Sequence, residues 1–240
     1  MSKTGAAFSV RFLRNGDQIT VVRNVIDSAG NGAALFQVVD TETGTPTPDW
    51  TKTENQPIIQ LGVRSAAGYP TEITNVAWAY DGVTLNFTYN GSNWVTANND
   101  SRFKSRINGN YYELMIVANI ASKTVVSNKQ ISYEVSYSSN AHRDIIQGSI
   151  DVLIQQAGSN SHILQITTNR VELDASNTTA TLTAVAAFGS TPVSIGTNDY
   201  AIEWYQDNVK LSGQTGATLI VTRDMVSGGS IFVAKLLKNG

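Results

Sequence analysis

An internal repeat limits what this chain can fold into more than any other feature of its sequence. Residues 76–85 (VAWAYDGVTL) align without a gap with residues 202–211 (IEWYQDNVKL), so that an aliphatic residue, Trp, Asp, Val and Leu fall at the same offsets in both. Each copy places an aliphatic residue and Trp at alternate positions, turns at Asp-Gly or Asp-Asn, and returns with Val and Leu at alternate positions. The repeat predicts two copies of one β module.

We expect the alternate apolar residues of both hairpins to point into the protein core, with the tryptophan at its centre. The predicted core residues are Trp78, Val83 and Leu85 in the first copy, and Trp204, Val209 and Leu211 in the second.

Short alternating runs recur along the whole chain, separated by turn signals such as Asn-Gly and Asp-Gly, which is typical of a β-sandwich. Before the first copy they predict strands at residues 8–13, 19–25 and 34–39. Residues 41–57 hold three prolines and are predicted to be a linker or long loop.

The repeat extends beyond the hairpins. Residues 58–65 and 180–185 occupy corresponding earlier strands, and residues 111–117 are matched to the strand at 230–236. Two further strands, at 131–137 and 150–154, are predicted to form a long hairpin in the first copy alone.

Composition excludes several classes of function. Charged residues make up 15% of the chain and the net charge is −2, so there is no basic field for nucleic acid to bind. The absence of cysteine excludes disulfides and thiol chemistry.

The N-terminus reaches the alternating run at Phe8 without an apolar stretch long enough for a signal peptide or a membrane span. We therefore expect synthesis in the cytoplasm and release by another route, as for a phage structural protein, with an ordinary cytoplasmic protein as the alternative.

The second copy resembles a known family. Trp204 with the residues that follow it to Asn208, then Leu211-Ser212-Gly213 and residues 218–222, is similar to the C-to-F strand region of bacterial and phage immunoglobulin-like domains. The resemblance covers most of residues 163–240 and, more loosely, 57–156. It implies an all-β fold of tandem immunoglobulin-like β-sandwiches with an N-terminal β segment.

The implied domains are an N-terminal docking or oligomerisation segment (1–55) and two immunoglobulin-like domains (56–158 and 159–240). Residues 48–51 (PDWT) with 55–59 (NQPII) also resemble a segment that precedes such modules in multi-domain structural proteins of Bacteroidetes phages. Residues 236–240 end on a hairpin-turn signal without a closing strand, so we expect that either a longer chain or a partner supplies it.

Candidates for chemistry are few. The two histidines, His142 and His162, stand in polar settings without metal-ligand spacing, and no pair of carboxylates or nucleophile and base is recognisable. Asn98-Asn99-Asp100 and Asn198-Asp199 carry oxygens that suit calcium, but fit turns better. We predict a protein that is not an enzyme and has no cofactor or metal.

Aromatic residues near loop ends of the first copy are the candidate partner or glycan contacts, with core packing as the alternative: Trp94, Tyr89, Tyr111 and Tyr112. The sequence thus favours a virion structural protein of tail, fibre or capsid surface, which contacts other virion proteins and copies of itself and does not bind nucleic acid or membrane. The alternative is a carbohydrate-binding or adhesin module that engages cell-surface glycans during host attachment.

Overall fold

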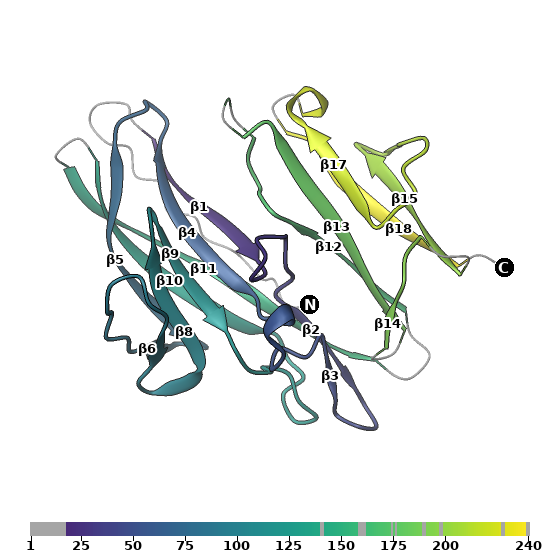
Figure 1. Cartoon of the computed structure of the whole chain (residues 1–240), viewed down its shortest axis with the longest axis horizontal. Helices are drawn as coiled ribbons and strands as arrows, with labels where there is room; N and C mark the ends of the chain where they lie inside the picture. Colours follow the sequence, from purple (N-terminus) through teal and green to yellow (C-terminus); the bar gives the residue numbers. More distant parts are fainter. Residues whose placement is uncertain are drawn as a thin grey trace, which may run out of the picture. The chain divides into compact units, whose positions relative to one another are not determined.

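The computed structural model describes residues 18–139, 142–157, 162–173, 175, 177–188, 191–196, 199–226 and 229–238. The regular elements of this part of the chain are β-strands and two short 3-10 helices, η1 (Thr53–Asn55) and η2 (Arg223–Met225), as Figure 1 shows. The predicted all-β fold class is confirmed. The strand predicted at residues 8–13 lies outside the described residues.

The strands, in chain order, are β1 (Ile19–Ile26), β2 (Phe36–Asp40), β3 (Pro46–Thr47), β4 (Ile58–Ser65), β5 (Thr71–Tyr80), β6 (Val83–Leu85), β7 (Val95–Ala97), β8 (Asp100–Asn108), β9 (Tyr111–Ile116), β10 (Lys129–Ser139), β11 (His142–Ala157), β12 (His162–Thr168), β13 (Thr179–Phe188), β14 (Thr191–Val193), β15 (Tyr200–Gln206), β16 (Val209–Lys210), β17 (Thr218–Thr222) and β18 (Phe232–Lys238).

The first sandwich comprises strands β1 to β11. One sheet has the order β1-β4-β9-β8-β7 and the other β3-β2-β11-β10-β5-β6. In immunoglobulin nomenclature β1, β4, β9 and β8 take the positions of strands A, B, E and D, while β11, β10 and β5 take those of G, F and C. The rings of Tyr80 on β5 and Phe103 on β8, 5.0 Å apart, join the two sheets. The first sandwich is immunoglobulin-like in strand order.

The second sandwich comprises strands β12 to β18. Its sheets have the orders β12-β13-β14, with β17 also pairing to β13, and β16-β15-β18. They correspond to strands A, B and E on one side and C and F on the other. Trp204 on β15 is fully buried among Ala184, Ile202, Leu219 and Val221, and its indole N–H donates to the Gly216 carbonyl at 2.9 Å. A buried tryptophan on strand C is characteristic of immunoglobulin folds.

Contacts along the chain also define two compact units. The first comprises Met1–Val22, Gln60–Glu113 and Lys129–Asp151, and the second Arg23–Ile59, Leu114–Asn128 and Val152–Gly240. Because segments of the two units alternate in sequence, the domain boundaries predicted after residues 55 and 158 stay predictions. Within the predicted docking segment, β1 joins the sheet of β4, whereas β2 pairs with β11.

The two hairpins of the repeat close in the same way. Asp81 and Gly82 both have positive φ (50° and 82°), as do Asp207 and Asn208 (49° and 69°). Two successive positive φ angles define a type I′ turn, which Asp, Asn and Gly favour. The shared Asp-Gly and Asp-Asn motif therefore has a common backbone cause.

Burial corrects part of the predicted core. Trp78 and Leu85 are buried and Leu211 packs against the second core, but Val83 and Val209 are 62% and 68% exposed. Each of these two valines is the first residue after its turn, at the end of the hairpin and on an edge strand. Each valine stands two residues before its leucine, as predicted, but the core does not extend to the hairpin tip.

The matching of strands between the copies also needs correction. The tryptophan strand β5 pairs with β6 and β10, as β15 pairs with β16 and β18. The counterpart of β18 is therefore β10 and not β9 (residues 111–116). The sequence matched β9 to β18 because both segments are apolar and follow a turn. Apolar alternation alone does not identify which strand pairs with which.

The proline-containing segment at residues 41–57 is more ordered than a linker. Trp50 is fully buried, and its backbone N–H donates to Asn119 Oδ1 at 2.8 Å. The amide of Asn119 in turn donates to Asp49 Oδ1 at 2.8 Å. The segment is a loop held by side-chain hydrogen bonds, with β3 and η1 inside it.

This loop predicts a pH dependence. Hydrogen bonds from Thr51 and then Asn119 hold the pKa of Asp49 below its ordinary value of 3.8. A lowered pKa in the folded state stabilises the protein above the unfolded-state pKa, and this stabilisation is lost as the pH falls through the folded-state value. We expect Asp49→Asn to flatten the loss of stability below about pH 4, measured as urea midpoints against pH. Parallel curves for the two proteins would contradict this assignment.

Candidate functional site

The most organised polar cluster described in the first unit crosses the outer face of the sheet β4-β9-β8-β7. On β9, Tyr112 and Leu114 are buried in the sandwich core, so the alternate residue Glu113 points to the opposite face. Gln60 on β4 donates to Glu113 Oε1 at 2.6 Å. From β8, Arg106 Nε donates to Glu113 Oε2 at 2.6 Å, and Asn108 donates to Oε1 at 3.0 Å.

Trp94 completes this row, just before β7. The Arg106 guanidinium lies 4.3 Å from the centre of the Trp94 ring, a cation–π contact. We name the side chains Gln60, Glu113, Arg106 and Trp94 the transverse row.

Charge and burial in the transverse row are unusual for an outer sheet face. The Glu113 side chain is 1% exposed and that of Arg106 29%. A carboxylate buried this far needs its partners, because a buried charge without them is costly. The one side-chain hydrogen bond of Arg106 in the described part of the chain uses Nε, so its two terminal nitrogens have no protein acceptor there.

Tyr111 lies beside the row on the same face. Its ring covers Gly62 of β4, where an added Cβ would come within 2.9 Å of the ring. The ring is therefore laid against the sheet, and Tyr111 is 39% exposed. Flat exposed rings of this kind suit stacking on sugars or on partner side chains.

The other two candidate contacts belong to the protein interior. Tyr112 is buried at 8% exposure, and its ring packs edge-on against Tyr89 at 6.0 Å. Tyr89 is half-buried, its hydroxyl lies 3.0 Å from Ser105 Oγ, and burial raises its pKa above the ordinary value of 10.0. Tyr112 occupies the inward position of β9, so for this residue the structure supports the alternative of core packing.

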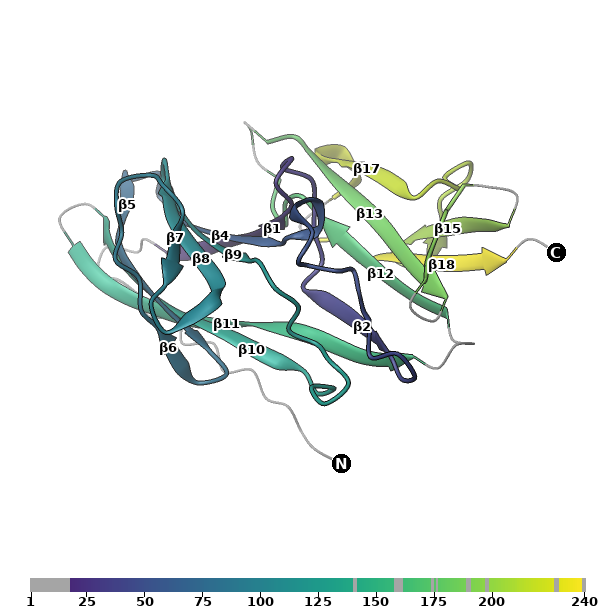
Figure 2. The same ribbon diagram turned by 60° about the horizontal axis from the view of Figure 1, so that its bottom comes forward.

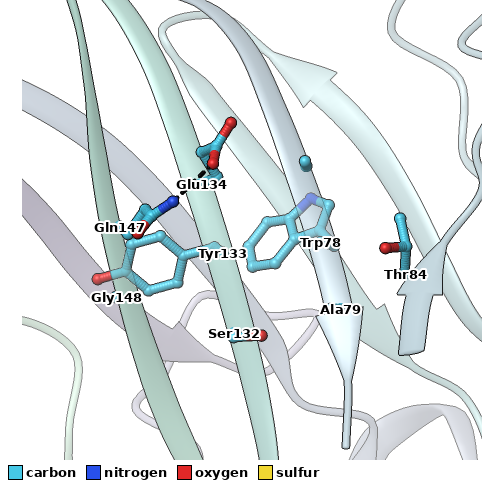
Figure 3. A pocket seen from close by; sticks show the side chains of 9 residues that line it. Trp78, Ala79, Thr84, Ser132, Tyr133, Glu134, Gln147 and Gly148 are labelled. Atoms are coloured by element: carbon cyan, nitrogen blue, oxygen red, sulfur yellow. Dashed lines mark hydrogen bonds between the residues drawn. The ribbon is translucent and has the colours of Figure 1, made fainter. Parts of the chain in front are cut away.

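A shallow groove of about 330 Å³ lies on the sheet of β5, β10 and β11 (Figure 3). Small outward side chains at Ala77, Ala79 and Ser132 leave this space, and Glu134 accepts a hydrogen bond from Gln147 at 2.7 Å on one side. Glu134 is the one charged side chain of the lining. The groove thus offers no paired acid and base for catalysis.

The remaining sequence candidates have structural roles where they are described. His162 lies 3.0 Å from the Tyr200 hydroxyl and 4.6 Å from the Phe188 ring. Asn99 bonds the backbone of Asn86 and Thr84. Asn198 and the side chain of His142 lie outside what the structure describes.

Asp100, the third residue of the Asn98-Asn99-Asp100 group, is paired with Arg102, whose hydrogen bond lowers its pKa. Within the described ranges, no three His, Cys, Asp or Glu side chains converge as metal ligands. No described helix is long and apolar enough to cross a membrane.

Sequence comparison gives no family: no protein-family model matches the chain, and no curated protein matches it. Among solved structures, the chain is similar to the N-terminal Ig1-2 module of the Drosophila receptor protein tyrosine phosphatase DLAR. The identity is 12%, 91% of each chain is covered, and the TM-score is 0.28. This score is too low to support an argument, so the immunoglobulin-like assignment rests on the strand order of the two sandwiches.

Proposed function

We propose that the chain is a non-catalytic structural protein of a phage particle, a tail, fibre or capsid-surface component made in the host cytoplasm. The observation that supports this proposal best is the pair of immunoglobulin-like sandwiches in one cysteine-free chain. Such modules hold their shape by packing alone, and their surfaces suit contacts with other virion proteins or further copies of the chain. The Bacteroidetes-phage resemblance of residues 48–59 agrees with it.

Quantitative mass spectrometry of purified particles from the source tests this proposal. We expect many copies of the chain per particle. Its absence from particles that contain other virion proteins at normal abundance would overturn the proposal.

The docking role of the segment 1–55 is part of the same proposal. Deleting the whole segment would remove β1 and β2, which belong to the sheets of the first sandwich. Deleting residues 1–17 removes no described strand and is the cleaner test. Loss of incorporation into particles is expected, and full incorporation would exclude these residues as the docking element.

The transverse row supports a second candidate, an adhesin that binds cell-surface glycans. Trp94 and Tyr111 place two aromatic side chains on one face, with the free donors of Arg106 between β7 and β9. Aromatic stacking combined with a few fixed polar groups is the usual chemistry of sugar recognition.

We expect Trp94→Ala to weaken glycan binding about fivefold, since one aromatic stack contributes about 1 kcal/mol. A glycan array followed by calorimetry on the best glycan measures this. Val83→Ala, at an exposed hairpin tip of the same sandwich, is the matched control. Equal binding by the Trp94 and Val83 variants would place any glycan site elsewhere.

A further inference from the structure

The outer face of the sheet β4-β9-β8-β7 in the first sandwich carries unpaired positive charge. On β8, Phe103 and Ser105 are buried. Lys104 and Arg106 alternate with them and therefore point outward. The outward neighbour of Lys104 across the sheet is the uncharged Thr96 of β7.

The carboxylates on this side are already neutralised. Glu113 is paired with Arg106 and is 1% exposed, and Asp100 is paired with Arg102 at 2.7 Å. Lys104 forms no ion pair with any residue that the structure describes. We name the outer surface around Lys104 and Arg106 the basic face.

The opposite sheet of the same sandwich presents two carboxylates. Glu134 on β10 and Asp151 on β11 each stand next to a buried residue in the alternation, so both point outward. Glu134 accepts a hydrogen bond from Gln147 at 2.7 Å (Figure 3), and Asp151 accepts one from Gln130 at 3.4 Å. Neither is ion-paired within the described ranges. We name this surface the acidic face; its charges and those of the basic face lie in the first compact unit.

The two faces also differ in relief. On the acidic face, Ala77, Ala79 and Ser132 line the groove of about 330 Å³ beside Glu134. On the side of the basic face, the Tyr111 ring is 39% exposed. A groove lined by small side chains and an exposed aromatic ring are complementary in shape, as the two faces are in charge.

We propose that copies of this chain associate head to tail, with the basic face of one copy on the acidic face of the next. Lys104 then faces Glu134 of the neighbouring copy. Contact between two basic or two acidic faces is disfavoured, because it brings like charges together. Since the faces lie on opposite sides of one sandwich, each added copy leaves one face of each kind exposed, and association continues into a ring or a filament.

The proposal rests on the virion function, because it names the contact through which further copies of the chain meet. Sedimentation velocity of the full chain tests it. With rising concentration in about 0.05 M sodium chloride, we expect a series of species that extends beyond the dimer. In about 0.5 M salt the series should shrink toward the monomer, because exposed charges are then screened.

Charge reversal tests the two faces separately. Lys104→Glu and Glu134→Lys should each weaken association about tenfold or more, since each removes the opposite charge from one face. The chain that carries both changes should associate more strongly than either single variant, because the pair is restored with its signs exchanged. Lys52→Glu makes the same charge change on an exposed loop outside both faces and should associate as the original chain does.

Three results would overturn the proposal. The first is a chain that stays monomeric up to about millimolar concentration at low salt, or that stops at a dimer. The second is equal association of the Lys104 and Lys52 variants. The third is a double variant as weak as the single ones.

The virion function is tested separately by mass spectrometry of particles. A chain that is abundant in particles but monomeric in solution would contradict this contact alone. A chain that associates as expected but is absent from particles would contradict the virion function alone.

Discussion

Trp204→Ala is expected to destabilise the second sandwich by about 3–5 kcal/mol, enough to unfold it under mild denaturant. Trp204 has no exposed surface, lies at the centre of the core cluster of this sandwich, and donates its indole N–H to the Gly216 carbonyl. Alanine removes the ring, leaves a cavity, and leaves that carbonyl without its partner. Native-state hydrogen exchange of β13 and β15 measures the loss directly.

Two variants separate the causes. Trp204→Phe keeps an aromatic ring but removes the donor to Gly216, so it should cost less than alanine. Val209→Ala, on the next strand and 68% exposed, should change stability by no more than about 0.5 kcal/mol. A Trp204→Ala protein with unchanged exchange in β13 and β15 would show that this core does not hold the second sandwich together.

Gln37→Leu should destabilise the protein by about 2–5 kcal/mol, although leucine is apolar and of similar size. Gln37 is fully buried on β2. Its amide donates to the Pro48 carbonyl at 2.9 Å and to Asn119 Oδ1 at 2.6 Å, and its Oε1 accepts from the backbone of Ile120 and Ala121, both at 2.9 Å. Leucine leaves the two backbone N–H groups buried without an acceptor.

Gln147→Leu is the matched control, because Gln147 is exposed and its hydrogen bond to Glu134 lies on the surface. We expect a change within about 0.5 kcal/mol for this variant in urea unfolding. Equal midpoints for the Gln37 and Gln147 variants would mean that the four hydrogen bonds of Gln37 do not contribute to stability.

The fold class followed from local signals that act without distant contacts. The Asp-Gly and Asp-Asn turns set two positive φ angles each, and the alternation around Trp78 and Trp204 sets which side chains face inward. The sequence could not tell where the core ends, which is why Val83 and Val209 were misplaced. Nor could it tell that β10 rather than β9 lies beside β5, since the neighbour of a strand depends on long-range pairing.

The candidate site was only partly predictable for a similar reason. Trp94 and Tyr111 stood out as aromatic residues near turns, but Glu113 and Arg106 look like ordinary charges of a solvated sheet face. Their pairing requires β8 and β9 to be neighbours in a known register, with Gln60 supplied from β4. The available signal was the glutamate between Tyr112 and Leu114. When these two apolar residues face the core, the charged side chain between them lies on the outer face of the same strand.

The parallel pairing of β2 with β11 has a mechanical consequence. Phe36 to Asp40 run alongside Leu153 to Ala157 in the same direction, as Figure 2 shows. Tension applied before β2 and after β11 pulls these two strands in opposite directions along their length, so their hydrogen bonds are loaded in shear together instead of being opened one after another. The first sandwich is therefore expected to resist stretching along the chain at forces well above those that peel apart an antiparallel hairpin such as β5–β6.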